Sequence, residues 1–147
     1  MRLFLLLLIF AACTGCDRHR TPSRYEIPKG YKGWLFIVWE CPKAAALPVD
    51  KNRVVIRFPK DGLVQTSSAK PDGWATDEFY WVLPNGALQF LGQTGSPQIN
   101  GDGGGTNNIG TTRQIKFSYF YVGEDYSPSM TPEESLEIAL QKAGIEG

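Results

Sequence analysis

The sequence predicts a mainly β domain, a β-sandwich or an open barrel, with one α-helix at the C-terminus. Three observations lead to this prediction: an aromatic-rich and glycine-rich composition, short apolar segments separated by turn residues, and one capped helical pattern near the end of the chain. The chain has eight Phe, six Tyr and four Trp together with 16 Gly and ten Pro. This mixture is typical of half-buried strands joined by tight turns.

The strand patterns begin with residues 34–39 (Trp-Leu-Phe-Ile-Val-Trp), which are apolar on both faces, as expected of a central strand covered on each side. Asn85 and Gly86 lie between two apolar segments and predict a hairpin. In the last strand, Phe117 and Tyr119 lie on one face and Phe120 on the other. The predicted strands are residues 34–39, 53–58, 63–66, 79–83, 87–91 and 115–122.

One helix is predicted after Thr131, which suits an N-cap, with Pro132 at the first helical position and Glu134 completing a capping box. It should end near Gly144. The apolar residues Leu136, Ala139, Leu140 and Ala143 share one face. We therefore expect this helix to pack on the sheet, with a partner-binding helix as the alternative.

The N-terminus has the pattern of a bacterial lipoprotein signal. Arg2 precedes the apolar run Leu3–Phe10, which is too short to cross a bilayer as an ordinary helix. Cys13 and Cys16 follow among small residues, and we favour Cys16 as the lipidation site. Acyl chains on that cysteine would bind the chain stably to a lipid bilayer. A plain secretory signal is the alternative, and Asp17 after Cys16 resembles an inner-membrane retention signal.

These features divide the chain into a signal and lipidation site (residues 1–16), a polar and locally basic tether (17–24) and a single domain (25–147). Removal of the signal leaves about 130 residues, enough for one core. Fifteen Lys and Arg balance fifteen Asp and Glu, so no overall charge favours nucleic acid. We expect a lipid-anchored domain outside the cytoplasm, in the bacterial cell envelope. The choice between inner and outer membrane stays open.

The residues of the domain offer little for catalysis. His19, the only histidine, lies in the predicted tether, so no histidine triad or multi-histidine metal site is expected. Cys41 has no histidine to activate it and is expected to be a buried apolar thiol. Asp77 and Glu78 are interpreted as solvated turn residues. We expect no catalytic residues, no metal site and no cofactor.

A possible binding surface comprises Trp74, Asp102 and Asn107. Trp74 lies in a turn-rich segment, where packing is expected first and ligand stacking is the alternative. Asp102 and Asn107 belong to the Gly-rich segment 100–108, which lacks the pattern of a P-loop or an EF-type calcium loop. We predict a long mobile loop there, because successive glycines have great backbone freedom.

Three segments together resemble an uncharacterised bacterial domain family that is often found behind lipoprotein signals. They are Ile27–Gly33 (Ile-Pro-Lys-Gly-Tyr-Lys-Gly), residues 58–64 (Phe-Pro-Lys-Asp-Gly-Leu-Val) and residues 120–123 (Phe-Tyr-Val-Gly). In the second segment, Phe58 and Val64 replace the apolar residues usual in the family. The resemblance implies no established activity. The opening also resembles prealbumin-like sandwiches, so a prealbumin-like or immunoglobulin-like sandwich is the preferred form of the fold.

The leading hypothesis for function is a membrane-anchored, non-catalytic binding or accessory module with an envelope protein or glycan as partner. One alternative is a carboxylate-dependent, glycan-active enzyme, which would require two acids about 5–10 Å apart. Asp77 with Glu124 is a pair that could meet in space. Another alternative is an inhibitor or immunity-type protein that uses the Gly-rich loop.

Overall fold

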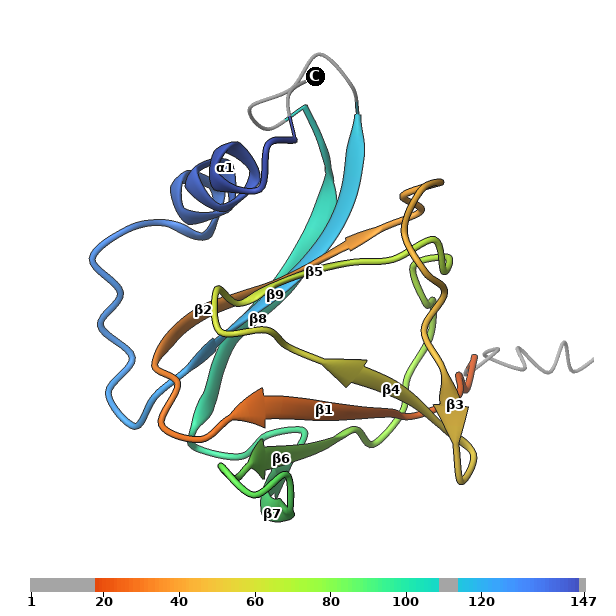
Figure 1. Ribbon diagram of the computed structural model, residues 1–147, viewed down its shortest axis with the longest axis vertical. Coiled ribbons are helices and arrows are strands. Elements are labelled where there is room, and N and C mark those ends of the chain that lie inside the picture. The colour runs from red at the N-terminus through yellow and green to blue at the C-terminus, as the bar shows by residue number, and fades with distance from the viewer. Residues whose placement is uncertain (1–17, 109–113, 146–147) are drawn as a thin grey trace, which may run out of the picture.

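The structure is a computed structural model that describes residues 18–108 and 114–145 (Figure 1). Cys13, Cys16 and Asp17 lie outside the described residues. The elements in chain order are β1 (Ser23–Pro28), β2 (Gly33–Trp39), β3 (Val49–Asp50), β4 (Arg53–Arg57), β5 (Leu63–Gln65), β6 (Glu78–Val82), β7 (Leu88–Gln93), β8 (Ile99–Asn107), β9 (Ile115–Val122) and α1 (Pro132–Lys142). None of the described helices is long and apolar enough to cross a membrane.

The strands form two mixed sheets, so the prediction of a mainly β sandwich is confirmed. One sheet has the order β3-β4-β1-β6-β7 and the other β5-β2-β9-β8, and they do not close into a barrel. Strand β1 pairs in parallel with both β4 and β6, and β2 pairs in parallel with β5. These parallel pairs distinguish the fold from an immunoglobulin sandwich, whose two sheets are antiparallel.

One hydrophobic core lies between the two sheets. The five-stranded sheet contributes Ile27, Ile56 and Phe79, and the four-stranded sheet contributes alternate residues of β2 and β9. The ring of Tyr25 stacks on that of Phe79 with 4.7 Å between the ring centroids. Burial removes these apolar side chains from water and is the main favourable contribution to folding.

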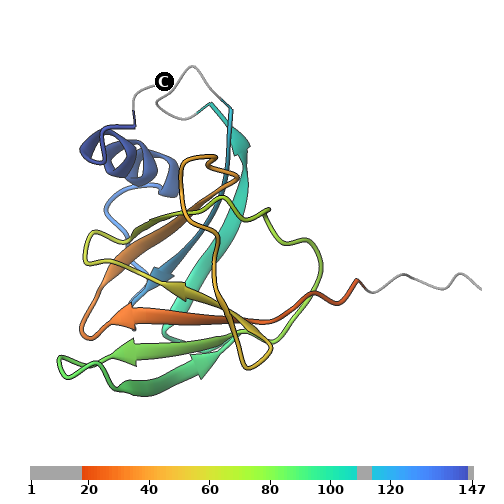
Figure 2. The same cartoon turned by 45° about the vertical axis from the view of Figure 1, so that its right-hand side comes forward.

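A second core lies between the four-stranded sheet and α1, so the molecule has three layers (Figures 1 and 2). The helix contributes Leu136 and Leu140, both almost fully buried. Its predicted start is confirmed: the Thr131 hydroxyl accepts a hydrogen bond from the backbone N–H of Glu134, whose carboxylate accepts one from the N–H of Thr131. The prediction that the helix packs on the sheet is therefore also confirmed.

All six predicted strands are present, as β2, β4, β5, β6, β7 and β9. Strand β2 is buried on both faces, and β6 and β7 form the hairpin predicted around Asn85 and Gly86. The sequence patterns did not predict β1, β3 or β8. The thiol of Cys41, predicted to be buried, is half-buried and lies 3.6 Å from the carbonyl oxygen of Val38.

Residues 18–24, predicted as a solvated tether, are structured and pair with residues 73–77. We call these two segments together the N-terminal clasp. The guanidinium of Arg20 donates two hydrogen bonds to the carboxylate of Asp77, at 3.0 and 2.6 Å, and the backbone N–H of Ser23 donates a third at 2.7 Å. Asp77 is only 6% exposed, so its interpretation as a solvated turn residue is wrong. The hydrogen bond with Asp77 raises the pKa of Arg20.

Arg20→Ala should destabilise the fold, because it leaves the buried carboxylate of Asp77 without its cation. We expect the free energy of unfolding to fall by about 3 kcal/mol, measured by urea denaturation followed by circular dichroism. Arg18→Ala is the matched control, because the Arg18–Asp72 ion pair is exposed on both sides and such pairs add little stability. Equal stability of the two variants would contradict the proposed importance of the Arg20–Asp77 pair.

Candidate functional site

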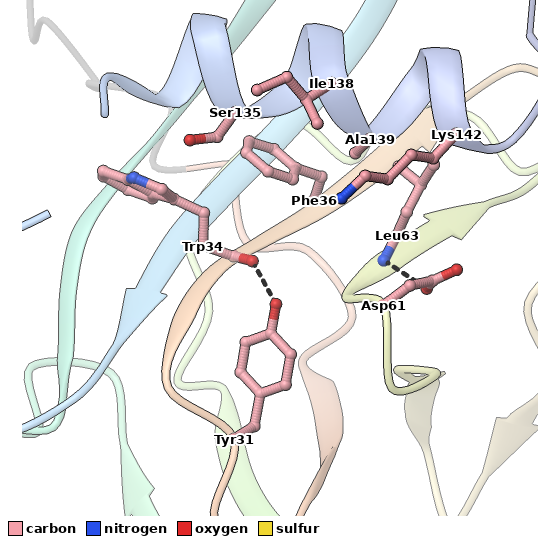
Figure 3. A pocket seen from close by; sticks show the side chains of 9 residues that line it. All are labelled: Tyr31, Trp34, Phe36, Asp61, Leu63, Ser135, Ile138, Ala139 and Lys142. Atoms are coloured by element: carbon pink, nitrogen blue, oxygen red, sulfur yellow. Dashed lines mark hydrogen bonds between the residues drawn. The ribbon is translucent and has the colours of Figure 1, made fainter. Parts of the chain in front are cut away.

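The candidate site is a groove between α1 and the edge of the four-stranded sheet formed by β2 and β5 (Figure 3). We call it the α1 groove. It has a volume of about 260 Å³. From the helix, Ser135, Ile138 and Lys142 point toward the sheet (Figure 3). The other residues that line the groove are Tyr31, Trp34, Phe36, Asp61, Leu63 and Ala139.

The shape of the α1 groove follows from strand alternation. Trp34 and Phe36 lie on the face of β2 that turns toward α1, and Leu63 lies beside them on β5. Tyr31 closes one end, where its hydroxyl donates a 2.7 Å hydrogen bond to the carbonyl of Trp34 (Figure 3). Gly62 has a φ of +77°, and a Cβ there would overlap the Tyr31 hydroxyl. The turn before β5 therefore requires glycine.

Two opposite charges lie at the rim of the α1 groove. One oxygen of Asp61 accepts a 3.2 Å hydrogen bond from the backbone N–H of Leu63, and its other oxygen can accept from a ligand. Lys142 makes no ion pair with any described residue. Burial and then the charge of Asp61 raise the pKa of the Tyr31 phenol, which keeps it protonated as a donor. The groove thus combines an apolar floor with one anion and one cation.

A second hollow adjoins the α1 groove on the other side of Trp34. It has a volume of about 310 Å³ and includes Tyr126, Met130 and Pro132. The Trp34 indole N–H donates a 3.0 Å hydrogen bond to the carbonyl of Met130, which fixes the ring between the two hollows. Tyr126, Met130 and Ile138 are all exposed. Exposed apolar side chains beside a hollow are typical of ligand or partner contacts.

The three residues predicted as a binding surface lie elsewhere. Trp74 is 63% exposed and is part of the N-terminal clasp, where it contacts the ring of His19. Asp102 and Asn107 are exposed residues of β8 in the four-stranded sheet. None of the three lines the α1 groove, so their role in binding stays a prediction.

The Gly-rich segment is a strand, so the prediction of a long mobile loop is wrong. Residues 99–107 form β8, which pairs antiparallel with β9, with a bulge between Asn100 and Gly103. The glycines make room for aromatic rings. A Cβ on Gly103 would lie 2.6 Å from the Tyr119 hydroxyl, and one on Gly101 would lie 2.7 Å from the Tyr126 hydroxyl. Tertiary packing therefore overrides the low strand propensity of glycine.

Asp102 lies close enough to this aromatic cluster to affect its ionisation. Burial raises the pKa of the Tyr119 phenol, and the carboxylates of Glu133 and Asp102 raise it further. Tyr119 and Tyr126 both contact the ring of Trp34 edge to face. The Gly-rich strand thus supports the aromatic residues beside the second hollow instead of forming a separate site.

Two buried carboxylates, Glu26 and Asp77, are held in ion pairs with arginines. Glu26 is fully buried and accepts hydrogen bonds from Arg24 at 3.0 Å and Arg57 at 2.6 Å. Asp77 is bound by Arg20, while Glu124 lines a separate hollow near Ser96. Within residues 18–108 and 114–145, no group of three His, Cys, Asp or Glu side chains is placed to hold a metal ion.

Sequence reasoning missed the α1 groove, because its lining comes from three segments that are far apart in the chain. One signal was present: Ser135, Ile138 and Lys142 have helical spacing and border the apolar stripe that contains Leu136 and Leu140. Such a border can line a groove wherever the helix does not cover the whole sheet. The position of Asp61 opposite this border depended on the parallel pairing of β5 with β2.

Comparisons with known proteins place the fold in a family. A family model described as "Family of unknown function (DUF6843)" matches residues 19–130. The chain belongs to this family. The DUF6843 match begins at His19 in the N-terminal clasp and ends at Met130, directly before the N-cap of α1. No match was found among curated proteins.

A solved structure shares this DUF6843 fold. A crystal structure described as "Putative Lipoprotein from Bacillus anthracis" is similar with a TM-score of 0.66 at 24% sequence identity. The similarity covers 84% of this chain and 93% of that chain. At this level of identity, the likeness shows the fold.

The role of the glycines in β8 can be tested with two neighbouring alanine substitutions. In Gly104→Ala, the new Cβ would overlap the backbone carbonyl oxygen of Phe117, and we expect a loss of about 1–3 kcal/mol in the free energy of unfolding. In Gly105→Ala, the Cβ would lie 3.8 Å from the Phe117 ring, an ordinary contact. Thermal and urea denaturation should show this control to be neutral or slightly stabilised, and a reversed order would contradict the packing described.

Proposed function

We propose that this DUF6843 protein is a lipid-anchored, non-catalytic binding module of the bacterial cell envelope, and that the α1 groove receives its partner. The N-terminal pattern Met1–Cys16 supports export and anchoring. The description of the structural neighbour as a lipoprotein supports the same location. The partner that fits best is an envelope polypeptide.

The α1 groove is the observation that carries the binding role. Its floor is made by Phe36, Leu63 and Ala139, so it can take an apolar side chain out of water. Asp61 and Lys142 at the rim can then bind polar or charged groups on either side of that side chain. An apolar anchor with polar contacts around it is the usual arrangement at protein–protein interfaces.

The alternatives have less support. An enzyme that uses Asp77 would first have to break its buried ion pair with Arg20, and Glu26 is held by two arginines. An inhibitor that inserts a Gly-rich loop would need such a loop, whereas residues 99–107 pair with β9. A binding module requires neither change.

Anchoring is tested by two matched cysteine substitutions in the exporting bacterium. We expect Cys16→Ser to abolish the acyl modification and release the protein from the membrane fraction, because the modified residue is lost. Cys13→Ser should leave both unchanged. Mass spectrometry of the mature N-terminus measures the modification directly. An unmodified N-terminus in the wild-type protein would contradict the anchoring part of the proposal.

Binding is tested by placing a charge in the α1 groove. Ile138 is 39% exposed on the helix, and Ile138→Asp should reduce the capture of an envelope partner about tenfold, equivalent to ~1.4 kcal/mol, measured by quantitative cross-linking in cells. Phe90→Asp is the matched control, because Phe90 is 55% exposed on β7, outside the groove. Circular dichroism should show both variants folded. Equal capture by both would contradict the assignment of the groove.

A further inference from the structure

We propose that the end of the domain that carries Trp74 lies on the lipid bilayer, with the Trp74 indole in the headgroup layer, and that the α1 groove faces away from the membrane. This inference rests on the proposed lipid anchor at Cys16. It adds a second, non-covalent membrane contact and a defined orientation of the domain.

The first step is that the chain next to the anchor is fixed to Trp74. The N–H of Trp74 donates a 2.8 Å hydrogen bond to the carbonyl of Arg18, and its carbonyl accepts one from the N–H of Arg20 at 3.1 Å. Gly73 has a φ of +104°, and any Cβ there would overlap the Arg18 carbonyl oxygen. The backbone at residues 18–20 therefore runs beside Trp74 as a short parallel bridge.

The second step is the short reach from the anchor. Consecutive Cα atoms are 3.8 Å apart, so the Cα of Cys16 lies within about 7.6 Å of that of Arg18. Paired strands are about 4.8 Å apart, which places the Trp74 backbone within about 13 Å of the acylated residue. The headgroup region of one leaflet is roughly 5–8 Å thick. The domain therefore cannot move far from the membrane surface.

The third step is the chemistry of the exposed side chain. Trp74 is 63% exposed, and its described ring contact is an edge-to-face one with His19 at 5.5 Å. An exposed indole is unfavourable in water but well suited to the membrane interface, where its ring contacts lipid and its N–H stays hydrated. The most exposed tryptophan among the described residues thus lies beside the predicted point of membrane attachment.

Electrostatic attraction is not expected to dominate membrane docking, because the three arginines of residues 18–24 are already paired. Arg20 is bound by Asp77, and Arg24 is bound by Glu26 and Asp50. Arg18 pairs with Asp72, although both are exposed. We therefore expect docking on zwitterionic as well as anionic lipid, with little dependence on salt.

The fold then orients the partner site. In both views of the molecule, the start of the described chain lies on one side and α1 on the opposite side (Figures 1 and 2). When the Trp74 end rests on the bilayer, the α1 groove is exposed to the compartment that the domain faces. Its partner can then reach it without passing between protein and lipid.

The test uses the acylated full chain, purified from bacterial membranes and reconstituted in phosphatidylcholine vesicles that carry bromine at a shallow acyl position. Bromine quenches only tryptophans close to it. We expect quenching in the wild-type protein and its loss in Trp74→Phe. In a Trp74→Phe, Phe90→Trp variant, the tryptophan on β7 should not be quenched. Circular dichroism checks that each variant is folded.

A linker variant separates docking from anchoring. About ten Gly and Ser residues inserted between Asp17 and Arg18 span roughly 16–19 Å as a flexible coil and should weaken the quenching of Trp74 while leaving the acyl chains in place. If the protein is acylated at Cys16 but Trp74→Phe does not change the quenching, the docking of Trp74 is overturned and the anchor is not. Acylation at Cys13 alone would overturn the argument that the acylated residue lies within about 13 Å of Trp74. An unmodified N-terminus would overturn both proposals.

Discussion

The fold depends on the burial of β2 on both of its faces. Leu35, Ile37 and Trp39 belong to the core between the sheets, whereas Trp34, Phe36 and Val38 belong to the core under α1. One strand therefore links three layers, and apolar burial on both faces leaves it no solvated side. Strand β9 follows the same alternation through its antiparallel register with β2. The floor of the α1 groove is part of this construction, because Trp34 and Phe36 are core residues and groove residues at once.

Glycines allow the aromatic residues around Trp34 to pack as they do. The large ring of Tyr119 on β9 needs space on the neighbouring strand. Strand β8 provides this space because it has glycine at position 103, opposite that ring. Trp34, Tyr119, Tyr121 and Tyr126 then meet edge to face, the arrangement preferred by aromatic quadrupoles. A segment that suggests flexibility by composition thus supports a packed aromatic cluster. Two of these rings, Trp34 and Tyr126, line the hollow beside α1.

Buried ion pairs fix the start of the domain. Glu26 in β1 and Asp77, directly before β6, are removed from water, and the charge of each is compensated by hydrogen bonds from arginine. The sequence predicts a tether at residues 17–24. The Arg20–Asp77 pair instead attaches this segment to the body of the fold. This attachment brings Trp74 next to the proposed lipid anchor. It also fixes where the described chain begins relative to the α1 groove, which a flexible linker would not do.

The sequence by itself determined the local features: the strand at residues 34–39, the Asn85–Gly86 hairpin, the alternating strand at 115–122, the capped helix and the pattern of an export signal. Each depends on neighbouring residues, through side-chain periodicity, turn geometry or capping. Tertiary structure alone decided that β1 lies in the centre of a sheet, that residues 99–107 form a strand, that Asp77 is buried and that Asp61 faces Lys142 across a groove. These depend on pairings between segments far apart in the chain, such as β1 with β4 and β6, and no local pattern encodes which distant partner a segment will meet.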